Sequence, residues 1–437
     1  MHMRHWLHWV PVAAVAILGL ATPASSADLG GNCCADLEER IAELEATTAR
    51  KGNRKVSLTV SGWVTQQVMY WDDGFEDNVY VIDAGSTIAS HVKFTGEAQI
   101  APGWSAGYVL HLEAIGSDSL GVDQDIASAN AVISGDRRGV QTLQSFWFLK
   151  SDQLGKVSVG LQSQASDNTA ILVDGSGSLV PANFVEFDYG NFAVRESGTG
   201  VPVIAWATLQ GCTDCNGLPE NSVRYDSPTL AGFSVSASWG EDDFWDVAAR
   251  YAGEFAGFKL AVAAAYSEST DDNVQGVGAG APFIDETHFF QVGAYVQHVP
   301  SGVFVYGAYG HFESKLSDLA LVLAPGVPIV GEEHEFWYVK AGLRQRWSAL
   351  GHTVLYGEYK NTENGVFPFS APGIFDFDSE TEMYGAGLVQ EIDAAAMSLW
   401  LKYRHVQGDL SLAFLGTAQT FNLDDFDYVA LGGLINF

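Results

Sequence analysis

Two short motifs in the sequence contain residue types that could carry out covalent chemistry. The first is Gly103–Gly107, which reads Gly-Trp-Ser-Ala-Gly and matches the pattern around the nucleophile of many serine hydrolases. That chemistry needs the serine on a sharp turn between a strand and a helix. Pro102 and Gly103 instead predict a hairpin turn, and Ser105 begins the strand that follows. No base is positioned near this serine, and we predict that the protein is not an enzyme.

The second motif is a pair of cysteines, Cys212 and Cys215, separated by two residues. Such a pair can act as a redox couple or supply half of a zinc site, but no other cysteine lies near and no helical pattern follows. The next two residues, Asn-Gly, predict a turn. In an oxidising compartment we favour a disulfide within a loop. A further pair, Cys33-Cys34, could cross-link protomers.

Acidic clusters are the remaining candidate ligand groups. Asp123 and Asp125, and the segment 332–335 (Glu-Glu-His-Glu), could bind a divalent cation. Acids in loops more often face solvent, and the 11 histidines show no spacing typical of metal ligands. We therefore predict neither a metal site nor a cofactor.

A repeated alternation of apolar and polar residues predicts the elements that carry these side chains. The chain ends on Val429, Leu431, Gly433, Ile435 and Phe437, apolar or glycine at every second position. Similar segments of about ten residues recur along the chain, as in strands that cross a bilayer within a β-barrel. A mean hydropathy of +0.06 fits this prediction, because only alternate residues must face lipid.

Sixteen segments between Val56 and Phe437 satisfy the alternation. The stretch Val203–Leu209 would be a seventeenth, but short turns then no longer all lie on the periplasmic side of the membrane. We therefore predict an all-β domain at residues 54–437, a 16-stranded antiparallel transmembrane β-barrel. Residues 164–220 are predicted to form a long constriction loop folded into its lumen.

The amino terminus has the pattern of a signal peptide at residues 1–27. Arg4 supplies a positive charge, Val10–Ala21 is apolar, and Ser25–Ala27 is a small-residue cleavage site. The apolar stretch is shorter than the roughly 18 residues of a membrane helix. Export to the outer membrane without a helical anchor is the expected result.

Residues 28–53 are predicted to form a short α-helix. Leu37, Ile41, Leu44 and Thr48 are spaced four, three and four residues apart, which is the heptad pattern of a coiled coil. Two heptads are too short to associate alone, but copies tethered to an oligomeric barrel have a high effective concentration. We favour a trimeric coiled-coil stub in the periplasm; a flexible helical leader and a lipidated Cys33 are the alternatives.

The charge balance excludes one class of partner. The chain has 53 acidic and 22 basic residues and a formal charge of −31. Nucleic acid is an unsuitable partner, because a polyanion would be repelled. The acidic excess also predicts a mild cation preference for any channel that the barrel encloses.

Four parts of the sequence carry a family resemblance: the leader 34–45, the start of the first strand at 54–58, the block 221–243 and the terminal Phe437. On these residues the chain resembles the alphaproteobacterial outer-membrane general porins. The resemblance implies a homotrimer of 16-stranded barrels, each a water-filled diffusion pore narrowed by a loop after the fifth strand. It also implies that Phe437 belongs to the insertion signal for the barrel-assembly machinery.

The predicted lumen face is basic, whereas the long loop is acidic. Opposite charges across a narrow opening would set a transverse field that orients dipolar solutes. The alternative is that lumen arginines pair locally with wall acids such as Glu97, Glu113, Asp246 or Glu358. The predicted pore-lining and constriction residues are Lys93, Arg224, Arg250, Lys259, Lys340, Arg344, Arg346, Lys402, Arg404, Asp174, Glu186, Asp188 and Glu196.

We predict a passive diffusion channel for ions and small hydrophilic solutes, surrounded by outer-membrane lipid and lipopolysaccharide. The alternative is a substrate-specific channel that binds one solute class. A file of aromatic residues along the lumen would favour a sugar-specific channel, and the predicted inward set contains no such file.

Overall fold

The computed structural model describes residues 56–127, 139–240, 243–270, 284–316, 330–331, 333–366, 369–370 and 375–437. The chain divides into two units, Met1–Gly52 and Asn53–Phe437, and the described residues all belong to the second. The predicted signal peptide, leader helix and Cys33-Cys34 pair lie outside the described residues. Among the described residues, none of the helices has the length and apolar character needed to cross a membrane.

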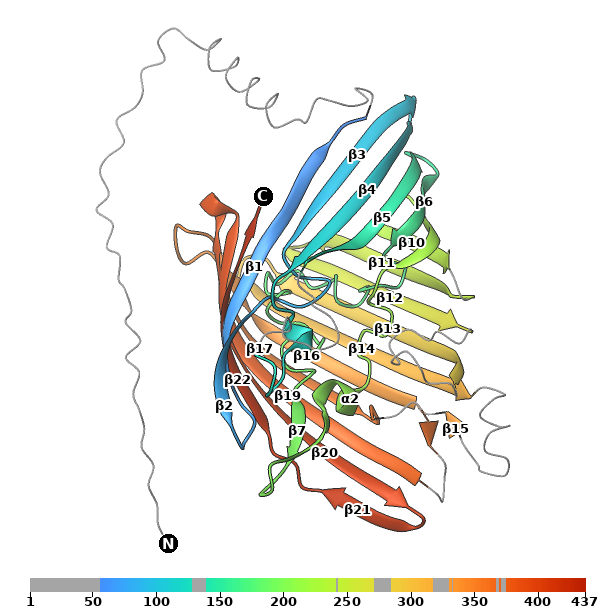
Figure 1. Ribbon diagram of the computed structural model, residues 1–437. Helices are drawn as coiled ribbons and strands as arrows, with labels where there is room; N and C mark the ends of the chain where they lie inside the picture. The colour runs from blue at the N-terminus through green and yellow to red at the C-terminus, as the bar shows by residue number, and fades with distance from the viewer. Residues whose placement is uncertain are drawn as a thin grey trace, which may run out of the picture. The chain divides into compact units, whose positions relative to one another are not determined.

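The second unit is an all-β closed barrel of sixteen long antiparallel strands (Figure 1). Each wall strand pairs with the next one along the chain, and the last pairs with the first. The wall strands are β1 (Thr59–Asp72), β3 (His91–Ala101), β4 (Trp104–Ile115), β5 (Gly139–Ser151), β6 (Gly155–Gln162), β9 (Glu220–Asp226), β10 (Phe233–Gly240), β11 (Trp245–Phe255), β12 (Phe258–Ser269), β13 (Ile284–His298), β14 (Val303–Leu316), β16 (Glu333–Gln345), β17 (Thr353–Glu363), β19 (Phe375–Ile392), β20 (Met397–Phe414) and β22 (Phe426–Asn436).

Shorter elements extend the wall or connect its strands. They are β2 (Asp77–Ile82) on β1, β21 (Thr417–Phe421) on β20, the pair β15 (Val330–Gly331) and β18 (Phe369–Ser370), and the 3₁₀ turns Ser119–Gly121 and Asp393–Ala395.

The barrel closes where β22 pairs with β1. Their register runs from Trp63 opposite Asn436 to Asp72 opposite Asp427. Phe437 continues the ladder: its N–H donates to the carbonyl of Gly62 and its own carbonyl accepts from the N–H of Gly62, both at 3.0 Å. Closure removes the free edges of an open sheet, which a bilayer would not tolerate.

Alternation along each strand separates a lipid-facing surface from an inward one. In β22, Leu431 and Ile435 are 59% and 42% exposed, whereas Phe426, Tyr428 and Ala430 are buried. Apolar side chains exposed at every second position fit a hydrocarbon surround. The inward side chains of β22 are apolar or aromatic because they pack against protein, rather than facing water.

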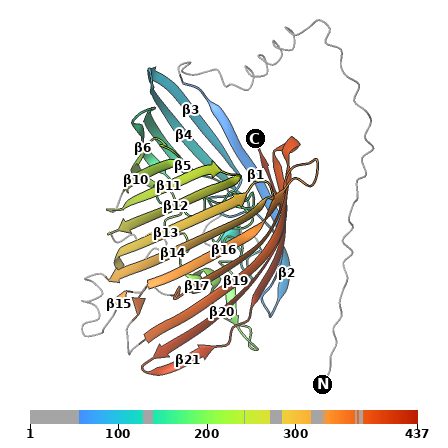
Figure 2. The ribbon, with the colours of Figure 1, turned by 180° about the vertical axis from the view of Figure 1, so that it is seen from behind.

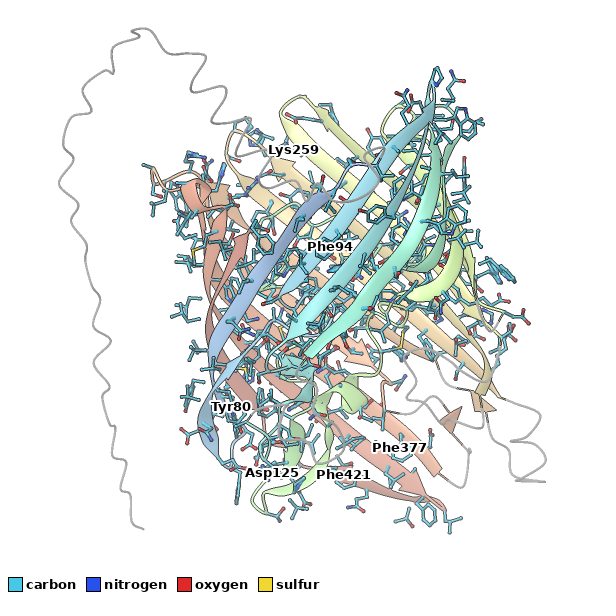
Figure 3. The ribbon with its side chains drawn as sticks, turned by 45° about the horizontal axis from the view of Figure 1, so that its top comes forward. Tyr80, Phe94, Asp125, Lys259, Phe377 and Phe421 are labelled. Carbon is cyan, nitrogen blue, oxygen red and sulfur yellow. A yellow bond between two sulfur atoms is a disulfide. The ribbon has the colours of Figure 1, made fainter. Side chains whose placement is uncertain are left out.

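The two ends of the barrel differ in their connections. Tight turns join strands at one end; Gly302, for example, adopts φ 71° in the turn between β13 and β14 and donates its N–H to the carbonyl of His298. Figure 3 shows Lys259 toward this end, with Tyr80 and Asp125 at the other. Long connections leave from that second end.

Residues 163–219, here called the insertion, leave the wall after β6 and return to it at β9, which pairs with β6. The insertion contains β7 (Ala193–Glu196), β8 (Val201–Ala205) and α2 (Trp206–Gln210), which lie inside the ring of strands (Figures 1 and 2). The stretch Val203–Leu209 is therefore part of β8 and α2 and not of the barrel sheet, as the turn count predicted.

The insertion packs against one side of the barrel through a shared hydrophobic core. The ring of Phe184 lies 4.8 Å from that of Phe336 on β16, and Phe192 packs between Trp71 and Phe426, at 5.1 and 4.8 Å. This core joins the insertion to the wall from β13 through β22 to β1. Burial of each large side chain stabilises the packed state by roughly 1.5–3 kcal/mol.

Candidate functional site

Three inward lysines of the wall form ion pairs with carboxylates of the insertion. The pairs are Lys340 with Asp174, Lys360 with Glu186 and Lys402 with Asp188. Nζ of Lys340 lies 2.6 Å from Asp174, and Nζ of Lys402 lies 2.5 Å from Asp188. The structure thus brings two predicted lumen cations, Lys340 on β16 and Lys402 on β20, together with predicted anions of the insertion. The third cation, Lys360 on β17, was not predicted.

Arg404 pairs with an acid of the wall and also contacts the insertion. Its Nε lies 2.9 Å from Oε1 of Glu358 on β17, and its Nη2 donates to the carbonyl of Asn183 at 2.6 Å. Glu358 also accepts a hydrogen bond from the hydroxyl of Tyr338 at 2.5 Å. One arginine therefore joins two strands and the insertion.

These charged groups are removed from solvent. Lys340 is 0% exposed, and Lys402 and Arg404 are 4% and 2% exposed. A buried charge is tolerated only with a partner, because desolvation costs several kcal/mol per ion. The cations consequently hold the insertion against the wall and do not face an open pore surface.

The carboxylates of the insertion differ in their preferred charge state. Burial alone would raise the pKa of Asp188, but Lys402 and further donors lower it. Burial raises the pKa of Asp214 to about 7, with an added effect of Glu186. Burial and the nearby Asp214 raise the pKa of Asp167 well above its usual range. Asp188 is thus held as an anion, whereas Asp167 favours its neutral form.

Four other predicted residues lie away from this cluster. Arg344 pairs with Glu391 at 2.8 Å and borders a cavity of about 300 Å³ next to Trp400. Arg346 was placed on a strand, but β16 ends at Gln345, and Arg346 forms an exposed pair with Asp393. Lys259 is exposed at the start of β12, and Glu196 lies at the end of β7, bridged to Leu423.

The remaining predicted cations border a larger cavity of about 550 Å³ on the opposite side of the lumen. Its wall side includes Lys93 on β3, His111 on β4, Arg224 on β9 and Arg250 on β11. The insertion supplies the facing surface, which is mainly apolar: Ile171, Leu172, Leu179, Val180 and Phe187. The insertion therefore divides the lumen into a packed side and an open side.

Hydrogen bonds fix the two arginines of this cavity. Arg224 binds Asp226 through Nη2 at 2.7 Å and donates from Nη1 to the carbonyl of Ser163 at 2.9 Å. Arg250 donates to the carbonyl of Ala165 at 2.5 Å and to Oγ1 of Thr169 at 2.8 Å. Both arginines thereby hold the first turn of the insertion near β9 and β11.

Small residues of the wall make room for that turn. Ala263 and Ala265 on β12 face inward and are 1% and 4% exposed, and Ala265 packs with Ala165 of the insertion. Gly293, opposite Ala263 on β13, leaves space that the backbone of the insertion fills. A strip of residues without bulk therefore forms the seat of residues 165–170.

Cys212 and Cys215 form a disulfide within the insertion, with Cα atoms 5.0 Å apart. Nε2 of His334 on β16 lies 2.6 Å from the carbonyl oxygen of Cys212. The disulfide therefore closes a short turn at the point where the insertion meets the rim of β16.

The described residues contain two groups with the composition of a metal site. In Cys212, Cys215 and His334 the two sulfurs are bonded to each other. The second group is Glu268, Glu286 and His288 at the outer rim. There Glu286 already forms an ion pair with Lys315, whose Nζ lies 2.7 Å from its Oε1. The predicted candidate Asp123 accepts a hydrogen bond from the N–H of Ile126 at 2.7 Å, as in an ordinary loop turn.

Ser105, the one serine in a hydrolase-like motif, is the second residue of β4 and pairs with Gln99 and Lys150 in the sheet. The residues that follow continue the strand to Ile115. The strand-to-helix turn of a nucleophile elbow is therefore not formed at this position.

Two charged residues at the site were not predicted from the sequence. Lys360 pairs with Glu186, and Lys156 lies 3.0 Å from Asp226. Both were detectable, because Lys360 continues the inward even-numbered face of its strand and Lys156 that of β6.

Comparison with known proteins gives one family. A family model described as Gram-negative porin matches residues 13–410. No curated protein sequence matches the chain.

Several solved structures share the fold. An anion-selective porin from Comamonas acidovorans is 15% identical, with a TM-score of 0.54 over 87% of this chain and 100% of that one. The trimer form of OmpT of Vibrio cholerae is 12% identical, with a TM-score of 0.52 over 87% and 99%. OmpF of Salmonella typhi is 15% identical, with a TM-score of 0.50 over 89% and 99%. At these identities the likeness concerns the fold.

Proposed function

The chain belongs to the Gram-negative porin family, a family of outer-membrane channels, and we propose that it forms a passive diffusion channel for ions and small hydrophilic solutes. The observation that carries this proposal is the cavity of about 550 Å³ enclosed between β3, β4, β9–β11 and the insertion. A sixteen-stranded barrel is wide enough to hold an aqueous path even with protein packed on one side.

The branch of the family, the oligomeric state and the membrane partners are further parts of the proposal. The leader and the block 221–243 favour the alphaproteobacterial branch of general porins. The trimer form of OmpT supports a homotrimer, with residues 28–53 as a periplasmic coiled-coil stub after a signal peptide at 1–27. Lipopolysaccharide is the expected neighbour of the acidic rim, and Phe437 is the expected signal for the barrel-assembly machinery.

Planar-bilayer recording of the purified protein tests the channel. We expect ohmic current that rises in groups of three equal steps, one for each barrel of a trimer. Absence of steps in a preparation whose barrels are folded would contradict the proposal.

A mild cation preference is the finer part of the proposal. It is supported by the excess of 53 acidic over 22 basic residues, which makes the potential at the channel mouths negative. Reversal potentials in a potassium chloride gradient should show potassium more permeant than chloride, and clear chloride preference would refute this part alone.

A substrate-specific channel is the second candidate. The apolar surface of the insertion inside the cavity favours it, since a purely diffusive pore needs no such surface. The two candidates differ in whether solute flux saturates as the solute concentration rises.

A further inference from the structure

The open side of the lumen contains cations without carboxylate partners. Among the described residues, Lys93 forms no ion pair, and Arg250 binds only a carbonyl and two hydroxyls, of Ala165, Ser236 and Thr169. Arg224 shares Asp226 with Lys156. The cavity wall therefore has more positive than negative charge.

His111 adds an unpartnered polar group to this wall. Its side chain is 7% exposed, borders the cavity and lies opposite Lys93 in the strand register. Neither ring nitrogen has a hydrogen-bond partner in the described part of the chain. A buried polar group without a partner costs about 1–3 kcal/mol, so a ligand that bonds to it would recover free energy.

The insertion does not supply the missing negative charge. Its carboxylates Asp174, Glu186 and Asp188 point away from the cavity into ion pairs with the opposite wall. Asp167, which does border the cavity, favours its neutral form because burial and Asp214 raise its pKa. On the packed side of the lumen, the opposite charges of the wall and the insertion neutralise each other in ion pairs. On the open side, the cations of the wall face no matching negative charge on the insertion.

The surface that faces these cations is apolar and exposed. Leu172 is 64% exposed although it lies inside the barrel. Leu179, Val180 and Phe187 continue the same surface. An apolar side chain held in a water-filled lumen gains stability when a solute covers it, at about 25 cal/mol per Å² of apolar area.

We propose that this cavity is a binding site for small organic anions that carry an apolar group, such as an aromatic monocarboxylate. The carboxylate of the solute bonds to Lys93, with the ring of His111 as a second donor, and its apolar part lies on Leu172 and Leu179. The proposal rests on the channel function proposed above and names the solute class for which that channel has a site.

Block of potassium chloride current through the full-length protein in planar bilayers tests the site. The probes are benzoate, acetate, which lacks the apolar group, and benzyl alcohol, which lacks the charge. We expect benzoate to half-block the current at a concentration roughly tenfold below that of either analogue, because it alone contacts both surfaces.

Substitutions assign the block to the two surfaces. Lys93→Gln should raise the half-blocking concentration of benzoate roughly tenfold. Leu172→Ser should raise that of benzoate severalfold and leave that of acetate unchanged. Lys150→Gln is the matched control: this lysine is exposed at the end of β5, does not border the cavity, and its loss changes the net charge equally.

The outcomes separate this site from the channel itself. Stepwise current with equal block by benzoate and benzyl alcohol overturns the anion site and leaves the channel intact. An equal effect of Lys150→Gln and Lys93→Gln also overturns it, since a general field would then explain the block. Folded trimers without current overturn the channel function and this site together.

Discussion

Lys340 illustrates how an inward-facing charge can have a partner other than water. Its strand register is readable from the sequence, because Phe336, Tyr338 and Lys340 alternate with lipid-facing residues. The surroundings of Lys340 cannot be predicted in the same way. The insertion has no periodic pattern from which the position of Asp174 opposite Lys340 could be inferred. The residue-level prediction of a lumen position was therefore possible, whereas its burial was not.

Removal of Lys340 should loosen the insertion strongly. Lys340→Ala leaves the carboxylate of Asp174 buried without its cation, and we expect a loss of about 3–5 kcal/mol in the stability of the packed insertion. Thermal unfolding and protease cleavage within residues 163–219 measure the effect. Arg346→Ala is the control, because its pair with Asp393 is exposed and worth less than about 1 kcal/mol. Equal effects of the two substitutions would contradict the buried-pair account.

The acid Asp214 should make the insertion less stable as the pH rises. Its folded-state pKa of about 7 lies above the ordinary value of 3.8, so the folded state binds the proton more tightly. Stability is then fully present below about pH 4 and declines up to about pH 7. Asp214→Asn should therefore slow hydrogen exchange of the insertion at pH 8, relative to the native chain, and have little effect at pH 4.

Asp188→Asn provides the opposite case. The pKa of Asp188 is lowered against the effect of burial by Lys402, so loss of its charge should destabilise the insertion at pH 8. If both asparagine variants change hydrogen exchange in the same direction at pH 8, the assignment of Asp214 as a destabilising anion is wrong.

At the scale of elements, strand positions were more predictable than strand lengths. Alternation in the sequence covers Phe244–Tyr251, whereas the strand there, β11, extends from Trp245 to Phe255. Alternation that begins at Glu380 belongs to β19, which already begins at Phe375. Alternation ends where strands leave the bilayer, because both faces then meet water. Backbone pairing continues beyond that point, but the side chains there no longer alternate. The sequence therefore does not show where the strand ends.

The seat of the insertion depends on Gly293 of β13. A Cβ at this position would overlap the backbone carbonyl oxygen of Ala170, so Gly293→Ala should displace residues 165–170 at a cost of about 1–3 kcal/mol. The single-channel conductance should change, because Asp167 and Ile171 border the cavity. Gly307→Ala on β14 is the matched control, since its Cβ would lie 3.6 Å from the nearest atom, the carbonyl oxygen of Tyr338. Unchanged conductance in Gly293→Ala would argue against this seat.

At the scale of the whole molecule, the barrel was predictable because two patterns had to agree: the alternation along each strand and an even total number of strands. An even number of strands, with all tight turns at one end, excluded Val203–Leu209 from the wall, and β8 and α2 bear this out. The packed half of the lumen was not predictable. Its inward aromatic residues, such as Trp71, Phe336 and Tyr428, satisfy the same alternation as a polar face would, because the period does not distinguish water from protein.

A charged residue on the lipid face tests the membrane position of the barrel. Val339 lies at the middle of β16 and is 41% exposed. Val339→Arg should lower the free energy of unfolding in lipid vesicles by about 2–4 kcal/mol, because the charge would enter hydrocarbon. Val339→Thr, which keeps the shape and replaces one methyl group by a hydroxyl, should cost less. Equal costs would mean that this face meets water.

The ion pairs of the insertion also impose an order on biogenesis. Asp174 is separated from Lys340 by 166 residues, and Asp188 from Lys402 by 214. The lysines that hold the insertion are thus synthesised long after the insertion itself. Contacts between such distant residues form slowly. During export and early assembly the carboxylates of the insertion therefore remain hydrated. The insertion can dock only when the carboxyl-terminal strands have completed the cylinder.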